Sequence, residues 1–212
     1  MRTLWLVRHG NRADFVDRTW RDTAPRPHDP PLSDDGVMQA RETGARLARE
    51  HIDYLFTSPF LRTVETAWHL AECLDLPVHI EHGLCEMLRA EWFPCPPDYL
   101  PVDEMARRFP RVNTTYHSVH RPAYPEDDAA LRARTAATVA QLLRQHPGNL
   151  LLIGHGATLY GIGHALLAPA VPLHTPLCCV IQLYEHDGRW HVAADGRDVS
   201  HLSQRESEIR LA

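Results

Sequence analysis

The sequence has no uninterrupted apolar run that approaches the roughly 20 residues that a membrane-spanning helix needs. It also lacks an excess of positive charge: 22 Lys and Arg stand against 27 Asp and Glu, for a formal net charge of −5. No global positive field therefore attracts nucleic acid or an anionic membrane. We expect neither as a partner, so any site for an anion must be local.

Cysteine is scarce and does not suggest disulfide bonds. The chain has five cysteines, an odd number, and Cys178 and Cys179 are adjacent. Neither feature suits the disulfide frameworks of small secreted domains. The first residues also show no secretory leader, because a strand pattern with Arg8 and Arg12 begins at once. We therefore predict a reducing, cytoplasmic setting.

Metal-binding patterns are incomplete as well. His79 and His82 form one spaced pair and His117 and His120 another, but no cysteine or carboxylate completes a ligand set at a convincing spacing. We expect no bound metal and no other cofactor.

What the sequence does contain is an alternation of strand and helix patterns. Apolar runs predict buried strands at 4–7, 52–57, 77–80 and 149–153, and helical periodicity follows at 33–50, 61–74, 126–145 and 157–167. Two last strands, at 177–184 and 190–194, flank the hairpin turn signal Asp187-Gly188. This order predicts an α/β fold: a three-layer α/β/α sandwich whose sheet is mostly parallel with an antiparallel edge strand.

Two proline-rich segments lack this periodicity. Residues 10–32 are predicted to form a long loop, and residues 87–125 a cap-like insert within a single domain that spans 1–212. Four aromatic residues of the insert either line a substrate pocket or pack the cap: Trp92, Phe93, Tyr99 and Tyr116. The polar tail after Asp198 is expected to fray.

Two histidines each follow a predicted buried strand and stand beside a glycine. They are His9, in Arg8-His9-Gly10, and His155, in Gly154-His155-Gly156. The carboxyl ends of parallel strands form the ligand crevice of open α/β sheets. A lone histidine there is usually a turn residue with a satisfied hydrogen bond. Because two occur in the same context, we interpret them as one site in which the imidazoles face each other.

Two arginines give this site its charge. Arg8 precedes His9, and Arg62 begins the helix after Thr57-Ser58-Pro59. The guanidinium fork and a helix N-terminus both suit a tetrahedral oxyanion. Taken alone, Arg62 would be interpreted as a surface residue that pairs with Glu65 or Glu42. Together with the histidines, it predicts a phosphate pocket in which a neutral imidazole attacks phosphorus without a metal.

Such a reaction also needs a general acid for the leaving oxygen. Glu86, which follows the third predicted strand in Gly83-Leu84-Cys85-Glu86, is placed for this role. Glu81 and Asp14 are the alternatives. A solvated loop carboxylate is the other interpretation of Glu86.

These residues carry a resemblance to a known family. Leu6-Val7-Arg8-His9-Gly10 resembles the signature of the histidine phosphatase superfamily, the phosphoglycerate mutase-like proteins, and four further motifs follow in the family's order: Pro31-Leu32-Ser33, Thr57-Ser58-Pro59 with Arg62, Gly83-Leu84 with Glu86, and Gly154-His155-Gly156. The resemblance implies a phosphoglycerate mutase-like fold, with His9 as nucleophile and Glu86 as proton donor. It further implies that Arg8, Arg62 and His155 bind the phosphate.

Details favour one branch of this superfamily. Asn11 stands where Glu, Gln or Thr is frequent, and its amide can still donate to a phosphate. The segment after Glu86 lacks the acidic, glycine-containing pattern of the mutases. The chain is more similar to the branch with the suppressor-of-T-cell-receptor-signalling phosphatases, with Arg12, Asp14, Gly156 and Glu126 as candidate substrate-pocket residues. Glu126, opening the long helix, resembles a family position near the leaving group.

Three functions are compatible with these motifs. The first is a cofactor-independent phosphomonoester hydrolase that acts on a phosphorylated small molecule or phosphoprotein. The second is a mutase that returns the phosphoryl group to the same small acid, and the third is a degenerate pocket that only binds a phosphorylated ligand. We favour the hydrolase, because a binding protein needs neither a nucleophile nor Glu86. A homodimer is compatible with the sequence.

Overall fold

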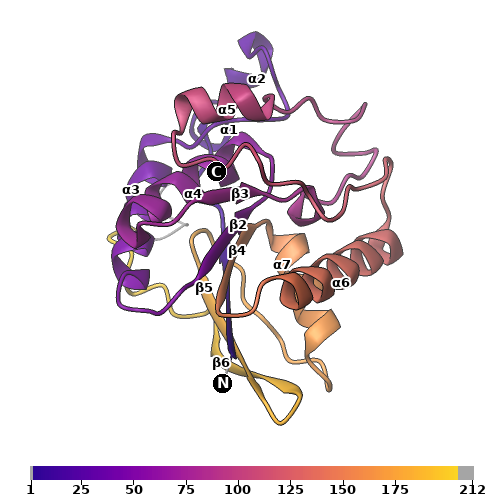
Figure 1. The fold of residues 1–212 in the computed structure, drawn as a ribbon. Helices are drawn as coiled ribbons and strands as arrows, with labels where there is room; N and C mark the ends of the chain where they lie inside the picture. The colour runs from indigo at the N-terminus through magenta and orange to yellow at the C-terminus, as the bar shows by residue number, and fades with distance from the viewer. Residues whose placement is uncertain (1, 205–212) are drawn as a thin grey trace.

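The computed structural model describes residues 2–204 and contains a six-stranded sheet in the order β3-β2-β4-β1-β5-β6 (Figure 1). The strands are β1 (Arg2–Arg8), β2 (Tyr54–Thr57), β3 (Val78–Ile80), β4 (Leu150–Gly154), β5 (Val180–His186) and β6 (Arg189–Asp195). The first four are mutually parallel, and β5 and β6 run antiparallel at one edge. The predicted α/β fold, with its mostly parallel sheet and antiparallel edge, is confirmed.

Helices cover both faces of the sheet. Helices α3 (Asp34–Leu47) and α4 (Leu61–Leu74) pack on one face, and α6 (Asp128–Gln145) and α7 (Gly156–Leu166) pack on the other (Figure 1). Side chains alternate along a strand, so β1 contributes to both apolar cores: Trp5 and Val7 lie in the α3/α4 core, and Leu4 and Leu6 in the α6/α7 core. Burial on both faces explains why β1 is a continuous apolar run.

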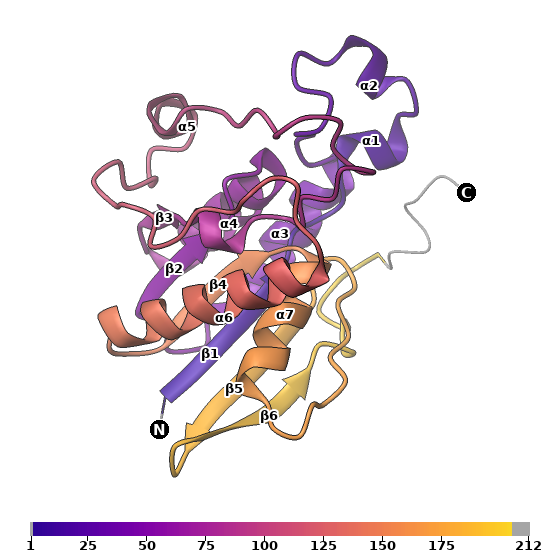
Figure 2. The ribbon, with the colours of Figure 1, turned by 90° about the vertical axis from the view of Figure 1, so that its right-hand side faces the viewer.

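The two proline-rich segments contain short helices that periodicity did not reveal. Residues 10–32 include α1 (Ala13–Val16) and α2 (Trp20–Thr23), each four residues long and without a fully buried residue. The later region contains the 3₁₀ turn η1 (His82–Leu84) and α5 (Val102–Arg108). Helices of only one or two turns are too short to leave a periodic pattern in the sequence. In Figure 2, α1, α2 and α5 lie beyond the end of the sheet toward which β1 runs.

Some element boundaries differ from the prediction. Helix α6 begins at Asp128 and not at Glu126, because Asp127 is its N-cap and accepts a hydrogen bond from the backbone N–H of Ala130 at 2.8 Å. Strand β5 begins at Val180 and not at residue 177, since Cys178 adopts a left-handed backbone with φ of 52°. The tail beyond Asp198 is described only as far as residue 204.

No helix within residues 2–204 combines the length and the apolar character needed to cross a bilayer.

Candidate active site

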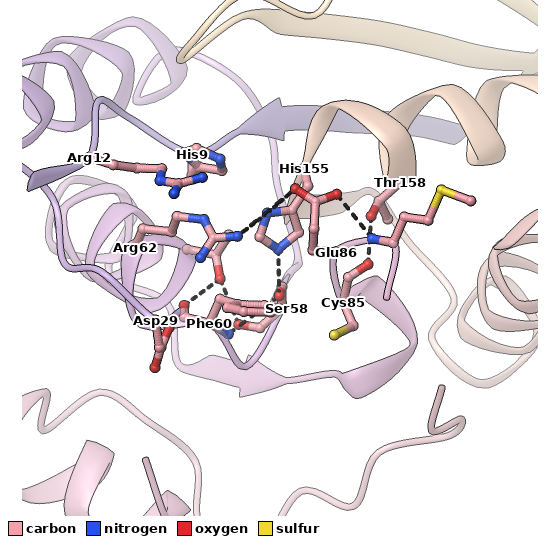
Figure 3. Close-up of polar contacts among 12 residues, drawn as sticks. His9, Arg12, Asp29, Ser58, Phe60, Arg62, Cys85, Glu86, His155 and Thr158 are labelled. Carbon is pink, nitrogen blue, oxygen red and sulfur yellow. Dashed lines mark hydrogen bonds and ion pairs between the residues drawn. The ribbon is translucent and has the colours of Figure 1, made fainter. Parts of the chain in front are cut away.

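The sheet register brings the two predicted histidines together. Strands β1 and β4 are parallel neighbours, and Arg8 pairs with Gly154, so His9 and His155 leave the sheet at matching positions. Their ring centroids are 5.3 Å apart, and both side chains are buried. Figure 3 shows both rings beside the guanidinium of Arg62. The prediction that both imidazoles share one crevice therefore holds in the geometry.

His9 is held in one tautomer. Its Nδ1 lies 2.7 Å from the carbonyl oxygen of Gly10. A carbonyl can only accept, so Nδ1 carries the proton and Nε2 keeps its lone pair. Burial, and then the positive charges of Arg62, Arg8 and Arg12, hold the pKa of His9 well below its ordinary value. The ring is therefore neutral at physiological pH.

Arg62 lies at the first turn of α4 and is buried, so the alternative of a surface residue does not apply. Its guanidinium stacks on the Phe60 ring at 4.2 Å and donates from Nη2 to Nδ1 of His155 at 3.2 Å. Burial lowers the pKa of Arg62 to about 10, so it remains a cation at neutral pH. Its Nε and Nη1 are buried and have no hydrogen-bond partner among residues 2–204. Two donors are thus available to an oxyanion.

Glu86 is the predicted general acid that lies at this site. One carboxylate oxygen is 3.4 Å from Nδ1 of His155 and 3.9 Å from Nη2 of Arg62, and the other accepts from the backbone N–H of Met87 at 3.0 Å (Figure 3). Its carboxyl group therefore faces the same centre as both histidines. The interpretation as a solvated loop carboxylate does not fit, because the side chain is only 16% exposed.

The two alternative acids have structural partners. Glu81 is fully buried and accepts hydrogen bonds from Gly83, Tyr116, Ser118 and Val119, at 2.7 to 2.9 Å. Its carboxylate therefore ties the segment after β3 to the loop around residue 118.

Asp14 also has partners: its Oδ2 forms ion pairs with Nη2 of Arg12 at 2.6 Å and Nη2 of Arg21 at 2.9 Å. Burial alone would raise the pKa of Asp14, but the hydrogen bonds and charges of these arginines outweigh it and lower the pKa. Asp14 is therefore ionised and cannot donate a proton at neutral pH.

A cavity of about 260 Å³ opens beside this centre. Its wall is cationic and aromatic and consists of Arg12, Arg21, His28, Arg62, Glu86, Glu91, Trp92 and Phe93. Neither His9 nor His155 lines this cavity. His155 contacts Arg62 and Glu86, and both of those residues line it. A larger hollow of about 660 Å³ lies at the β5–β6 edge and includes none of the predicted site residues.

Three other predicted residues, Arg8, Gly156 and Asn11, are not among the residues that line this cavity. Arg8 donates to the carbonyl of Thr175 at 2.7 Å, while its charge still acts on His9. Gly156 begins α7 next to Arg8: a Cβ there would lie 3.9 Å from Nε of Arg8. Asn11 is buried, and its backbone N–H donates to the Gln39 side chain at 2.9 Å.

Of the four predicted pocket residues, only Arg12 lines the cavity; Asp14, Gly156 and Glu126 do not. The Glu126 carboxylate has another partner. Because α6 starts two residues later, its carboxylate is buried against Arg134, with an Oε1–Nε distance of 2.6 Å. That Glu126 lies near the leaving group stays a prediction.

Several cavity residues were not singled out from the sequence. Arg21, His28 and Glu91 form part of the wall, and Ser58 accepts from Nε2 of His155 at 2.9 Å. Of the four aromatics left undecided, Trp92 and Phe93 line the cavity. The Tyr99 hydroxyl instead lies 2.9 Å from the Cys85 sulfur, and Tyr116 bonds Glu81. The sequence offered one sign for Arg21, His28 and Glu91: they lie in the two segments without periodicity, and long loops of this kind are often functional.

Curated proteins are similar to this chain in sequence. The chain is 29% identical over 238 residues to an ecdysteroid-phosphate phosphatase of Drosophila melanogaster, an alignment that covers 89% of this chain and 31% of that protein. It is 26% identical over 209 residues to the human ubiquitin-associated and SH3 domain-containing protein A, with 78% and 31% covered. The chain thus spans about a third of the length of these curated relatives.

The fold has a matching solved structure. An ecdysone phosphate phosphatase from Bombix mori, in complex with tungstate, superposes with a TM-score of 0.76 at 24% identity, and 92% of each chain is covered. At this identity the likeness concerns the fold.

A family model matches most of the chain as well. The model of the histidine phosphatase superfamily (branch 1) matches residues 4–196. This range includes every motif on which the resemblance was based, and the relative with ubiquitin-associated and SH3 domains agrees with the branch that those motifs favoured. The protein therefore belongs to the histidine phosphatase superfamily.

Proposed function

We propose that this protein hydrolyses phosphate monoesters through a phosphohistidine intermediate on His9, without a metal. The observation that carries the proposal is the bond from Nδ1 of His9 to the Gly10 carbonyl. It leaves Nε2 with a lone pair, and the lowered pKa of His9 keeps that lone pair free of a proton at neutral pH. A neutral nucleophile beside arginines needs no metal ion for its activation.

The charges around His9 suit the phosphoryl group. We assign phosphate binding to Arg8, Asn11, Arg62 and His155, with Gly156 beside Arg8. The two buried nitrogens of Arg62 that lack partners in the described chain support this role. Phosphoryl transfer requires mainly positioning and neutralisation of the equatorial oxygens, which fixed guanidinium groups supply. Arg12, at the cavity wall, is proposed to contact the rest of the substrate, and so is Asp14, which pairs with Arg12.

The reaction has two steps. In the first, Nε2 of His9 forms a bond to phosphorus, the bond between phosphorus and the ester oxygen breaks, and Glu86 gives its proton to that oxygen. In the second, water attacks phosphorus, its proton passes to the Glu86 carboxylate, and the nitrogen–phosphorus bond breaks. Inorganic phosphate leaves, and the enzyme returns to its initial protonation state.

The substrate is proposed to be a phosphorylated small molecule or a phosphoprotein. Among the relatives, the fly protein is named for ecdysteroid phosphate. The described cavity is small and aromatic, so we expect the phosphate and the first atoms of the ester group to be enclosed, with the remainder passing Trp92. We further propose that residues 87–125 act as a cap within one domain spanning 1–212.

Rapid quenching with a labelled phosphate ester tests this function. We expect acid-labile, base-stable label on the protein, none on His9→Ala, and no loss of turnover with a chelator. Full turnover by His9→Ala, or a strict requirement for a divalent metal, would overturn the proposal.

Two further outcomes identify the other functions. Conversion of 3-phosphoglycerate to an isomer, in place of phosphate release, would identify a mutase. Phosphate binding without hydrolysis of any ester in a broad panel would identify a binding protein.

A further inference from the structure

The segment that carries Glu86 is held by one buried arginine. After η1 the chain has no regular structure, yet its carbonyl oxygens converge on Arg134 of α6. Nη1 of Arg134 donates to Gly83 at 2.8 Å and to Cys85 at 3.1 Å, and Nη2 lies 3.4 Å from the carbonyl of Glu86 itself. A single rigid guanidinium thus contacts three of four consecutive residues that end at Glu86.

Glu126 fixes this guanidinium from the other side. Its two oxygens lie 2.6 and 2.7 Å from Nε and Nη2 of Arg134, and both side chains are almost completely buried. The backbone N–H of Glu126 donates to the carbonyl of Leu88 at 2.9 Å. The pair therefore brackets residues 83–88, with contacts before, at and after Glu86.

A second helix holds the same segment. The hydroxyl of Thr158 in α7 donates to the carbonyl of Cys85 at 2.7 Å (Figure 3). Helix α7 is the helix that follows His155. The residue before Glu86 is thus tied to the element that positions the second histidine of the site.

Stability alone does not account for this pair. Burying two charges costs desolvation free energy, and the attraction between the charges offsets only part of it. Apolar side chains of similar volume often stabilise a fold as well as a buried ion pair does, or better. A bidentate guanidinium does, however, fix the direction of several hydrogen bonds at once. We propose that Arg134, held by Glu126, is a positioning residue that places the carboxyl of Glu86 at the leaving oxygen. The proposal rests on the function assigned to Glu86 above.

The dependence of the rate on the leaving group tests this role. An ester with a weakly basic leaving group, p-nitrophenyl phosphate, needs little protonation, whereas an alkyl phosphate depends on the general acid. For Arg134→Lys, and for Arg134→Met combined with Glu126→Gln, we expect kcat/KM for the alkyl ester to fall by about 10-fold or more. We expect kcat/KM for p-nitrophenyl phosphate to fall by less than about 3-fold, because kcat/KM reports only the steps up to phosphorylation of His9, before Glu86 takes the proton from water.

Val139→Ala is the matched control, because it truncates, on the same helix, a buried apolar side chain that makes no hydrogen bond to the segment. It should lower Tm without changing the ratio of the two rates. If the Arg134 variants do not fold, Thr158→Val removes the bond to Cys85 and should shift the ratio in the same direction.

Glu86→Gln separates the two proposals. If Glu86→Gln changes the ratio and the Arg134 and Thr158 variants lower both rates equally, the positioning role is overturned and the general acid stands. If Glu86→Gln leaves the ratio unchanged, both assignments are overturned. A changed ratio in Glu86→Gln and in the Arg134 variants supports both.

Discussion

The hydrogen bond from Arg62 to His155 sets which nitrogen of His155 carries a proton, and Ser58 receives that proton. Nη2 of Arg62 can only donate, so Nδ1 of His155 accepts and Nε2 must carry the hydrogen. Ser58 receives that hydrogen at 2.9 Å. The Ser58 hydroxyl therefore orients the His155 ring in the candidate active site.

We therefore expect Ser58→Ala to lower kcat/KM by about 10-fold, because a buried N–H loses its acceptor at a cost of about 1–3 kcal/mol. Steady-state kinetics with p-nitrophenyl phosphate would measure this. Thr57→Val is the control: the adjacent Thr57 hydroxyl is buried and has no hydrogen-bond partner in the described part of the chain. Equal losses in both variants would contradict the role of Ser58.

The charges near His9 predict the acid side of the pH profile. The pKa of His9 is lowered by burial first and then by Arg62, Arg8 and Arg12, so the neutral, reactive form persists to acid pH. Arg12→Gln removes one of these charges and should raise the pKa of His9. The acid limb of kcat/KM would then move to higher pH, by a few tenths of a unit, and NMR titration of His9 should show the same direction. A limb that stays in place, or moves to lower pH, contradicts the assignment of that limb to His9.

Helix α3 supports the turn that follows β1. Ser33 is its N-cap, since Ser33 Oγ accepts from the backbone N–H of Gly36 at 3.2 Å. At Gly36 the helix and the turn are in direct contact: a Cβ there would lie 2.1 Å from the carbonyl oxygen of Asn11. The start of α3 thus sets the path of the chain just after His9.

Gly36→Ala should therefore reduce both Tm and kcat/KM. In an exposed helix, replacing glycine with alanine stabilises the fold by about 1 kcal/mol. A loss of stability in Gly36→Ala would therefore be the opposite of the ordinary effect. Ser33→Ala is the comparison, because it removes the cap at a cost of about 1 kcal/mol without adding an atom against Asn11. Thermal unfolding and turnover would be measured for both. A Gly36→Ala variant as stable and active as the parent would show that the turn can move away.

Across the fold, acidic groups buried beside the site make stability depend on pH. Glu65 of α4 accepts the backbone N–H of Leu32 at 2.6 Å, and Asp29 accepts that of Leu61 at 2.7 Å. Burial raises the pKa of Glu65 to about 7 and that of Asp29 to about 6. These carboxyl groups join the long loop to α4, so their ionisation is linked to folding.

For Glu65 the folded pKa lies above the unfolded value of 4.5. Its contribution to stability is present below that value and is lost as the pH rises through about 7. Glu65→Gln keeps an oxygen acceptor for Leu32 and removes the ionisation. We expect the variant to exceed the parent in free energy of unfolding by about 1–2 kcal/mol near pH 8, and to match it near pH 4. Urea titrations at both pH values would measure this; a constant difference between them would contradict it.

The sequence alone was enough to predict the sheet and the four charged or imidazole groups at its edge. A buried parallel strand must be a continuous apolar run, and a ligand must approach where that run ends. His9, Arg62 and His155 therefore lie beside local patterns that can be recognised in isolation. Glu86 follows the same logic, because it comes shortly after β3.

The partners of the charged groups required the three-dimensional structure. Glu126 binds Arg134 and not the cavity, Asp14 is neutralised by two arginines, and Glu81 holds a distant loop. These pairings join residues through tertiary packing, and the free energy of a buried charge depends on those neighbours rather than on adjacent sequence. The apolar pattern of the chain thus indicated where the candidate active site lies, whereas packing determined which carboxylate faces its histidines.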